Sequence, residues 1–284
     1  MNKILIPLLC FSAVLASGTS AAVMKIHRQV LETQVRVRTE KAGGSGTVIY
    51  SQKTDKFYST YILTCHHVVE DAIRLETKWD SVVRKDRKKE MLVPVLVELF
   101  KWDMVPHGDK PVAAQFNAEI AAYSPDHDIA IVHVLLGEAP PVAKLPSLSQ
   151  IHAVSVGSEA LAVGCALGHD PILTVGHVSH MGDVIDGKDY WMSTAQIIFG
   201  NSGGGVFTPF DGDYFYIGIP SRVDVIGWGT AVSHCGYFSP ISRIYEFLEE
   251  QIFDFLIPGS DRTEAQCAKE RKDRRDLEER KIYQ

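Results

Sequence analysis

The sequence predicts an all-β protein followed by a C-terminal helix and a charged tail. From residue 34 to about residue 239, short apolar or alternating runs, four to eight residues long and rich in Val and Ile, are separated by Gly, Pro, Asp and Ser. No regular helical pattern alternates with these runs, which argues against a parallel α/β sheet. About a dozen strands at this spacing are typical of a β-sandwich or a β-barrel.

The expected strands follow one another with turn residues between them. Their ranges are 34–39, 46–51, 58–64, 92–101, 112–123, 129–135, 160–165, 174–181, 190–193, 205–207, 215–223 and 236–240. A short helix is expected after His67, and a second helix is expected to begin at Pro240. The segment 84–90 (RKDRKKE) lies in a long connection, where we expect a solvated loop rather than a binding patch.

The chain ends in a helix and a tail of different character. Six apolar residues recur at helical spacing, so one face of this helix should pack on the core: Ile241, Ile244, Tyr245, Leu248, Ile252 and Phe255. Of the last 24 residues 15 are charged, and the two signs nearly balance. We therefore expect residues 259–284 to form an exposed helix or a disordered tail that contributes little to folding.

The N-terminus has the pattern of a secretion signal. Lys3 supplies a positive charge, residues 4–16 form an apolar run, and residues 16–22 (ASGTSAA) offer the small side chains of a cleavage site. The run is shorter than the roughly 20 residues of a membrane-spanning helix. We expect a signal peptide over 1–22, a folded domain over 23–258 and a secreted or periplasmic mature protein with no stable membrane anchor. The alternative is a buried N-terminal helix.

Composition and charge exclude several classes of protein. With 45% hydrophobic and 23% charged residues, the chain is neither disordered throughout nor collagen-like. A net charge of −6 lacks the basic character of a nucleic-acid-binding protein. Four cysteines would follow the signal peptide, too few for a disulfide framework. Neither the cysteines nor the histidines have the spacing of a zinc motif, so we expect no metal and no cofactor.

Three short stretches contain candidate reactive residues. A histidine follows an apolar strand in 62–69 (ILTCHHVV), an aspartate precedes a buried strand in 124–132 (SPDHDIAIV), and a serine lies in a glycine-rich turn in 199–206 (FGNSGGGV). Acyl transfer from an amide needs a hydroxyl, a base that accepts its proton and a carboxylate that orients the base. Glycines beside the serine let backbone amides converge on the oxyanion of the intermediate. The combination therefore indicates catalysis by a serine nucleophile.

These stretches resemble the catalytic motifs of trypsin-fold serine proteases of the HtrA/Deg type. ILTCHHVV is similar to ILTNAHVV, SPDHDIAIVHV to DPxxDIAVLKV, and GNSGGGVF to GNSGGPLV. Further similar stretches lie at 44–49 (GSGTVI), 162–168 (AVGCALG), 211–219 and 236–241 (GYFSPI). The resemblance covers residues 43–250 and implies two six-stranded antiparallel β-barrels, with the catalytic residues in the cleft between them.

The resemblance implies a catalytic triad. His67 rather than His66 is the general base, because it precedes Val-Val as the family's histidine does. Asp128 rather than Asp126 is the orienting carboxylate, because it directly precedes Ile-Ala. The nucleophile is Ser202. The oxyanion hole is formed by two backbone amides, those of Gly200 and Ser202.

The resemblance also implies a substrate-binding surface. Its four residues are Gln196, Ile197, Ile219 and Ser221. The first two would line the primary specificity pocket, and the strand around Pro220 would pair with the substrate backbone. No charged residue lies between Trp191 and Ser202, so we expect an apolar pocket and cleavage after small or medium aliphatic residues. Recognition of an acidic side chain by Gln196 or His234 is the alternative.

The chain departs from the family pattern at several positions. Cys65 and His66 replace the usual small pair before the histidine, and Gly205 replaces a proline after the nucleophile turn. Pro220 removes one backbone donor from the substrate-pairing strand. The tail is far too short for a PDZ domain.

We expect an exported serine endopeptidase, a hydrolase that cleaves protein or peptide substrates through an acyl-enzyme intermediate. The alternative is a catalytically silent protease-fold protein with a binding or chaperone-like role. An esterase of the α/β-hydrolase type is disfavoured, because it would need GxSxG and the order Ser, Asp, His. The sequence leaves the oligomeric state open.

Overall fold

A computed structural model describes residues 21–81, 84–102 and 111–282. Most of the expected signal peptide lies outside these ranges, and residues 21 and 22 belong to a helix that extends to residue 29. Among the described residues, no helix has both the length and the apolar composition to cross a bilayer. The four described cysteines are free, so no disulfide constrains this part of the chain.

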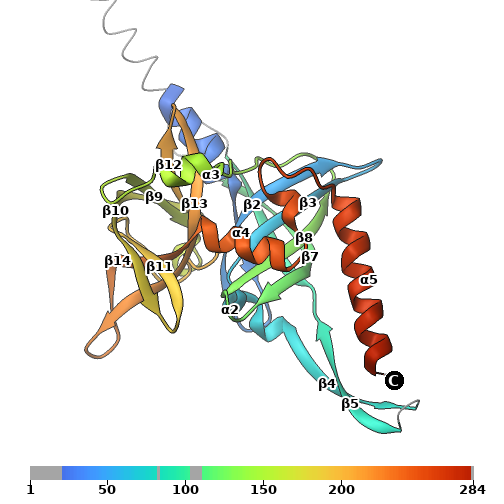
Figure 1. Cartoon of the computed structure of the whole chain (residues 1–284). Coiled ribbons are helices and arrows are strands. Elements are labelled where there is room, and N and C mark those ends of the chain that lie inside the picture. The colour runs from blue at the N-terminus through green and yellow to red at the C-terminus, as the bar shows by residue number, and fades with distance from the viewer. Residues whose placement is uncertain (1–20, 82–83, 103–110, 283–284) are drawn as a thin grey trace, which may run out of the picture.

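Two closed antiparallel barrels of six strands each form the body of the molecule (Figure 1). The first barrel contains β1 (Gln34–Arg38), β2 (Gly43–Lys53), β3 (Tyr58–Thr64), β6 (Val95–Trp102), β7 (Pro111–Ser124) and β8 (Ile129–Leu136). The second contains β9 (Glu159–Gly164), β10 (Ile172–Ile185), β11 (Lys188–Ser193), β12 (Gly205–Phe210), β13 (Asp213–Ile226) and β14 (Thr230–Pro240). The prediction of an all-β fold with two six-stranded barrels is confirmed.

Short helices precede, connect or follow the strands. They are η1 (Leu31–Thr33), α2 (His66–Val69), η2 (Glu70–Ala72), α3 (Leu148–His152), η3 (Ala166–Gly168) and η4 (Asp254–Leu256). The segment between the barrels contains α3, whose N-terminus is closed by a capping box between Ser147 and Gln150.

Strands β3 and β8 are buried on both faces for most of their length, which explains why the sequence of β8 is a nearly continuous apolar run. One face points into the first barrel, and the C-terminal segment covers part of the other. The ring of Tyr61 on β3 lies 5.9 Å from that of Phe253 and 5.4 Å from that of Phe255. These edge-on contacts fix the C-terminal segment against the barrel.

Helix α4 (Ile241–Glu250) covers the core through one apolar face, as its periodicity predicted. Its buried apolar residues are Ile241, Ile244, Tyr245, Phe247 and Leu248. The Tyr245 hydroxyl donates a hydrogen bond of 2.7 Å to the carbonyl of Pro146. The periodicity continues past the end of the helix, because Ile252 and Phe255 are also buried, one in the following turn and the other in η4.

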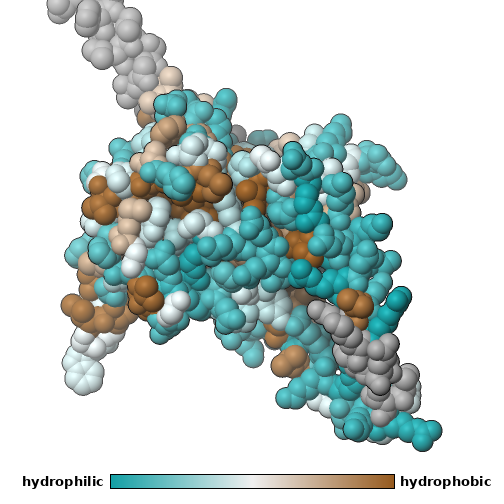
Figure 2. All heavy atoms as spheres, in the orientation of Figure 1, coloured by the Kyte–Doolittle hydropathy of each residue, from teal (hydrophilic) through white to brown (hydrophobic). Residues whose placement is uncertain are grey.

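The expected loop at 84–90 is instead part of a β-hairpin. β4 (Ile73–Asp80) and β5 (Lys85–Leu92) pair with each other in a separate two-stranded sheet. This hairpin, the β4–β5 arm, is largely hydrophilic (Figure 2). The charged run in β5 (KDRKKE) favoured a loop in the sequence, but β5 pairs with β4 along its whole length, and charged pairs such as Asp80 with Arg87, 3.0 Å apart, also link the strands.

The tail forms α5 (Glu264–Ile282), and the first half of this helix contacts the first barrel. The Glu264 carboxylate accepts hydrogen bonds from Ser59 (2.9 Å) and Tyr61 (2.6 Å) on β3. The Arg271 guanidinium lies 3.8 Å from the centre of the Phe253 ring. The tail is therefore attached to the domain by polar and cation–π contacts.

Candidate functional site

The three predicted catalytic residues come from separate elements that meet between the barrels. His67 lies in α2, which follows β3, and Asp128 directly precedes β8. Both belong to the first barrel. Ser202 lies in the turn before β12 of the second barrel.

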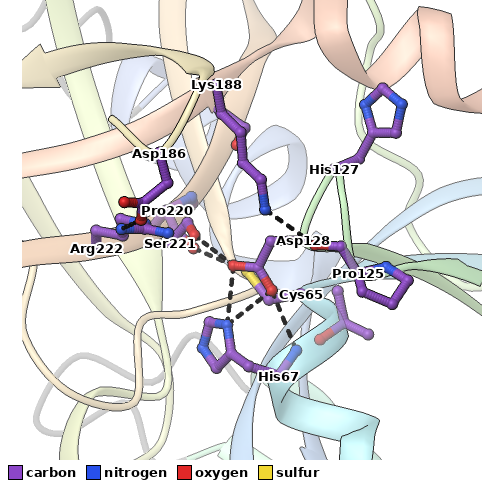
Figure 3. A network of polar contacts seen from close by, with 12 residues as sticks. Cys65, His67, Pro125, His127, Asp128, Asp186, Lys188, Pro220, Ser221 and Arg222 are labelled. Atoms are coloured by element: carbon purple, nitrogen blue, oxygen red, sulfur yellow. Dashed lines mark hydrogen bonds and ion pairs between the residues drawn. The ribbon is translucent and has the colours of Figure 1, made fainter. Parts of the chain in front are cut away.

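His67 and Asp128 form a close pair (Figure 3). The Nδ1 atom of His67 lies 3.0 Å from Oδ1 and 2.9 Å from Oδ2 of Asp128, and the His67 backbone N–H donates to Oδ1 at 3.1 Å. The Ser221 hydroxyl donates a further bond of 2.6 Å to Oδ2. With the carboxylate on Nδ1, the Nε2 atom of His67 is left as the proton acceptor.

The same hydrogen bonds govern the ionisation of Asp128. Burial alone would raise its pKa, but the hydrogen bonds and charge interaction with His67, together with the bond from Ser221, hold the pKa below its usual value. Asp128 is therefore ionised at neutral pH. The neighbouring His66 faces elsewhere: its ring stacks on that of Tyr123, and burial lowers its pKa.

The turn that leads to Asp128 is held by cations from the second barrel and α4. Arg243 is 7% exposed, and its guanidinium donates to the carbonyls of Asp126 (3.5 Å) and His127 (3.2 Å). The Lys188 ammonium donates to the carbonyl of Pro125 at 3.0 Å. Asp128 itself has a φ of +55°, a left-handed conformation that this bonding stabilises.

Sequence reasoning missed Arg243. Its guanidinium also bonds the carbonyl of Asp189 at 3.0 Å and lies 5.3 Å from the centre of the Tyr190 ring, so it joins α4 to both barrels. Helical periodicity gave no signal for it, because Arg243 lies roughly opposite the apolar face formed by Ile241 and Ile244 and would be expected in solvent.

The nucleophile turn is held mainly by backbone contacts. Gly200 and Gly203 have φ values of +95° and +87°. A Cβ on Gly203 would lie 2.2 Å from the Ser45 carbonyl oxygen, and one on Gly200 would lie 2.6 Å from the Leu167 nitrogen. Both positions therefore require glycine.

Ser45 on β2 joins this turn to the first barrel. Its backbone N–H donates to the Ser202 carbonyl at 2.8 Å, and its hydroxyl donates to the Gly200 carbonyl at 2.6 Å. The same hydroxyl accepts a bond of 2.7 Å from the backbone N–H of Cys165. Sequence reasoning treated Ser45 as part of a motif and gave it no role.

The turn and the helix that carries His67 pack on one point of β2. A Cβ on Gly44 would lie 2.9 Å from the Ser202 carbonyl oxygen and 2.6 Å from a methyl group of Val68. Within the described ranges, Ser202 Oγ makes no hydrogen bond to His67. The amides of Gly200 and Ser202 donate to no acceptor there either, so both are available to an oxyanion.

The predicted substrate-binding residues lie in different environments. Ile197 is 2% exposed and packs in the core of the second barrel, against Gly236. Ile219 is 0% exposed, also in the core. Gln196 is exposed, and the Ser221 side chain contacts Asp128. Their assignment to substrate binding stays a prediction.

Cys65 completes the surroundings of the His67–Asp128 pair. Its thiol is fully buried and donates to the carbonyl of Pro220 at 3.3 Å. The backbone N–H of Gly203 donates to the same carbonyl at 3.0 Å. Burial, together with the nearby charge of Asp128, raises the pKa of the thiol well above its usual value.

A family model of the trypsin-like peptidase domain matches residues 44–219. No curated protein matches the chain significantly. Similar solved structures include the HtrA-type protease AlgW with a tripeptide, at 19% identity and a TM-score of 0.56, with 82% of this chain and 64% of that chain covered. The serine endoprotease from Yersinia pestis is similar at 18% identity and a TM-score of 0.54, with 80% and 65% covered. The chain thus spans just under two thirds of the length of these proteins, and the likeness shows a shared fold.

Proposed function

We propose that this chain, which belongs to the trypsin-like peptidase domain family, is a serine endopeptidase that cleaves proteins or peptides through an acyl-enzyme intermediate. The observation that carries the proposal is the His67–Asp128 pair, with 2.9 Å between Nδ1 and Oδ2, beside a glycine-rich turn that holds Ser202. Burial of a carboxylate costs free energy, and here the cost is offset by bonds that also fix the orientation of the imidazole.

In the proposed reaction, Ser202 Oγ attacks the substrate carbonyl carbon while Nε2 of His67 accepts the hydroxyl proton. Asp128 stabilises the imidazolium that forms. The amides of Gly200 and Ser202 bind the oxyanion. His67 then gives its proton to the leaving amine, and water repeats the sequence to hydrolyse the ester.

In the proposed enzyme, Ser202 Oγ reaches Nε2 of His67 by rotation of the serine side chain. Turning Ser202 about its Cα–Cβ bond moves the hydroxyl while the backbone turn stays on Ser45. Catalytic hydrogen bonds in free enzymes are often long and shorten once substrate binds.

The proposed substrate is an extended peptide with a small or medium aliphatic side chain at the cleaved bond. The absence of charge between Trp191 and Ser202 supports this choice. A bound tripeptide is named for the similar AlgW structure, which agrees with peptide binding in this fold.

Export through a signal peptide over residues 1–22 is also part of the proposal, and N-terminal sequencing of the mature protein tests it.

A peptide-library cleavage profile tests the activity. The full mature chain should cleave after Val, Ala or Leu, and Ser202→Ala should lower turnover by about a million-fold. A profile dominated by Lys, Arg or Glu would refute the apolar pocket but leave the peptidase proposal standing. Equal cleavage by the wild type and Ser202→Ala would refute the nucleophile.

One observation favours a second candidate function, a catalytically silent binding or chaperone-like protein. Within the described residues, Ser202 Oγ has no hydrogen bond to its proposed base. A protein of this second kind would hold unfolded chains without cleaving any of them. Suppression of aggregation of a denatured test protein, with no cleavage at any pH, would favour this second function.

A further inference from the structure

Cys65 places a thiol beside the two residues of the proposed base. Its sulfur, a ring nitrogen of His67 and a carboxylate oxygen of Asp128 all lie within 4.8 Å of one another. Figure 3 shows the sulfur next to the Asp128 carboxylate, with His67 on the adjoining side. In the family motif ILTNAHVV an asparagine stands at this position, so the thiol is a feature of this chain.

We propose that Cys65, His67 and Asp128 form a binding site for a divalent cation of the zinc class, and that the bound cation switches off the peptidase. Thiolate, imidazole and carboxylate are all zinc ligands, with bond lengths of about 2.3, 2.0 and 2.1 Å. A tetrahedral ion with these bonds separates its ligand atoms by roughly 3.3 to 3.7 Å. The Nδ1–Oδ2 separation is 2.9 Å and all three ligand atoms lie within 4.8 Å of one another, so shifts on the order of 1 Å bring them to that range.

The site is reachable from one side. The His67 side chain is 42% exposed and that of Asp128 is 13% exposed, whereas Cys65 is fully buried behind them. A cation therefore arrives past His67, toward the negative charge of Asp128. Three protein ligands leave a fourth position for water, as in other zinc sites that are not fully enclosed.

A cation bound at Nδ1 of His67 would prevent this residue from acting as the base, because it changes which ring nitrogen carries the proton. This consequence rests on the proposed peptidase function. In the working pair, Nδ1 carries the proton and bonds Asp128, and Nε2 accepts the proton of Ser202. A cation on Nδ1 takes that lone pair, so the imidazole proton moves to Nε2, which becomes a donor. The Cys65 thiol loses its proton to solvent, since a coordinating thiol is deprotonated. One proton is released for each cation bound.

Spacing in the sequence could not reveal this site. Cys65 and His67 are close together, but Asp128 arrives from another strand, and the sequence analysis looked for local zinc motifs. The separate elements meet through the closure of the first barrel, in which β3 pairs with β8.

Cadmium and zinc titrations of the mature protein test the proposal. Cd²⁺ should give the ultraviolet charge-transfer absorption of a thiolate–cadmium bond in the wild type and in Cys235→Ala, whose thiol lies elsewhere. The part of this absorption that belongs to the site should be absent in Cys65→Ala and Cys65→Ser. In parallel, Zn²⁺ should slow labelling of Ser202 by a fluorophosphonate probe at least about tenfold in the wild type, and less than about twofold in Cys65→Ala, each relative to its own metal-free rate.

Absorption that is unchanged by Cys65→Ala would overturn the site, as would equal zinc sensitivity of both proteins. If Cys65→Ala fails to fold, His67→Gln removes a ligand at the half-exposed edge and should abolish the absorption in the same way. If no protein labels even without metal, the peptidase function fails while the cadmium absorption still decides the site.

Discussion

Asp128 and Ser202 are both carried by tight turns, but the two turns are held in different ways. Charged side chains from outside hold the first turn, with Arg243 and Lys188 bonded to its carbonyls. Glycines and one neutral hydroxyl, that of Ser45, hold the second. The first turn therefore depends on cations from distant parts of the sequence, and the second depends on close packing of the backbone.

Among substitutions outside the proposed triad, the largest expected effect is in the closely packed turn. Gly203→Ala would place a methyl group 2.2 Å from the Ser45 carbonyl oxygen at a φ of +87°, so the turn must move. We expect peptidase activity to fall by about 100-fold to 1,000-fold, the range seen when an oxyanion donor is lost.

Gly212→Ala is the matched control for Gly203→Ala. Gly212 has a φ of +78°, and a Cβ there would have no neighbour closer than 4.0 Å. It should cost only the roughly 1–2 kcal/mol of a left-handed residue and leave activity unchanged. Equal activity losses in the two variants would show that backbone strain, and not packing, limits the turn.

Ser45→Ala tests the one hydroxyl that holds the same turn. It leaves the Gly200 carbonyl and the Cys165 N–H without this partner in a buried site, which should cost about 1–3 kcal/mol of unfolding free energy. We expect kcat to fall by about tenfold or more with little change in KM, since the substrate surface stays. Ser51→Ala on the same strand, which loses only a hydroxyl pair with Thr60, is the control. A loss confined to KM would contradict a positioning role.

Arg243→Met tests the turn held by charges. The variant keeps the aliphatic stem but removes donors from three carbonyls, and we expect the unfolding free energy to fall by about 2–3 kcal/mol. Activity should fall severalfold, less than in Gly203→Ala. Arg222→Met is the control, because Arg222 lies 5.3 Å from the same Tyr190 ring but pairs with Asp186. Urea unfolding measures both variants. Equal losses of unfolding free energy would show that the effect comes from packing on the Tyr190 ring and not from the bonds to the carbonyls.

The smallest expected effect concerns pH. Asp128 has a lowered pKa in the folded state, so it contributes stability above its unfolded pKa and loses that contribution as pH falls through the folded value. Ser221→Ala removes one of the bonds that lower this pKa. The acid loss of stability should then be smaller and should be complete at a higher pH, with about 1 kcal/mol lost at pH 7. If the unfolding free energy of Ser221→Ala depended on pH in the same way as that of the wild type, the proposed contribution of the Ser221 bond would be contradicted.

The sequence predicted the twelve barrel strands because their apolar runs pack in closed barrels, where burial imposes a pattern on each strand. The β4–β5 arm was not predicted, because residues 85–90 of β5 are all charged and were interpreted as a solvated loop. The contact of α5 with the domain was not predicted either. Glu264 and Arg271 are charged, and a reading of composition alone places charged residues in solvent.

The sequence predicted the site residues that lie in a local motif. It did not predict those that reach the site from distant parts of the chain. His67, Asp128 and Ser202 each lie in a recognisable stretch. Arg243 reaches its turn from a helix more than a hundred residues later in the chain, and Ser45 reaches the nucleophile turn from another barrel. Their roles depend on tertiary contacts that spacing does not encode.

The labelling rate of Ser202 by a fluorophosphonate probe tests the central claim, that two differently held turns form one working triad. The wild type should label rapidly, His67→Ala should label slower by several orders of magnitude, and His66→Ala should label at nearly the wild-type rate, since the His66 ring stacks on Tyr123 away from Asp128. Slow labelling of the wild type at the His67→Ala rate, or loss of labelling in His66→Ala instead, would contradict the account.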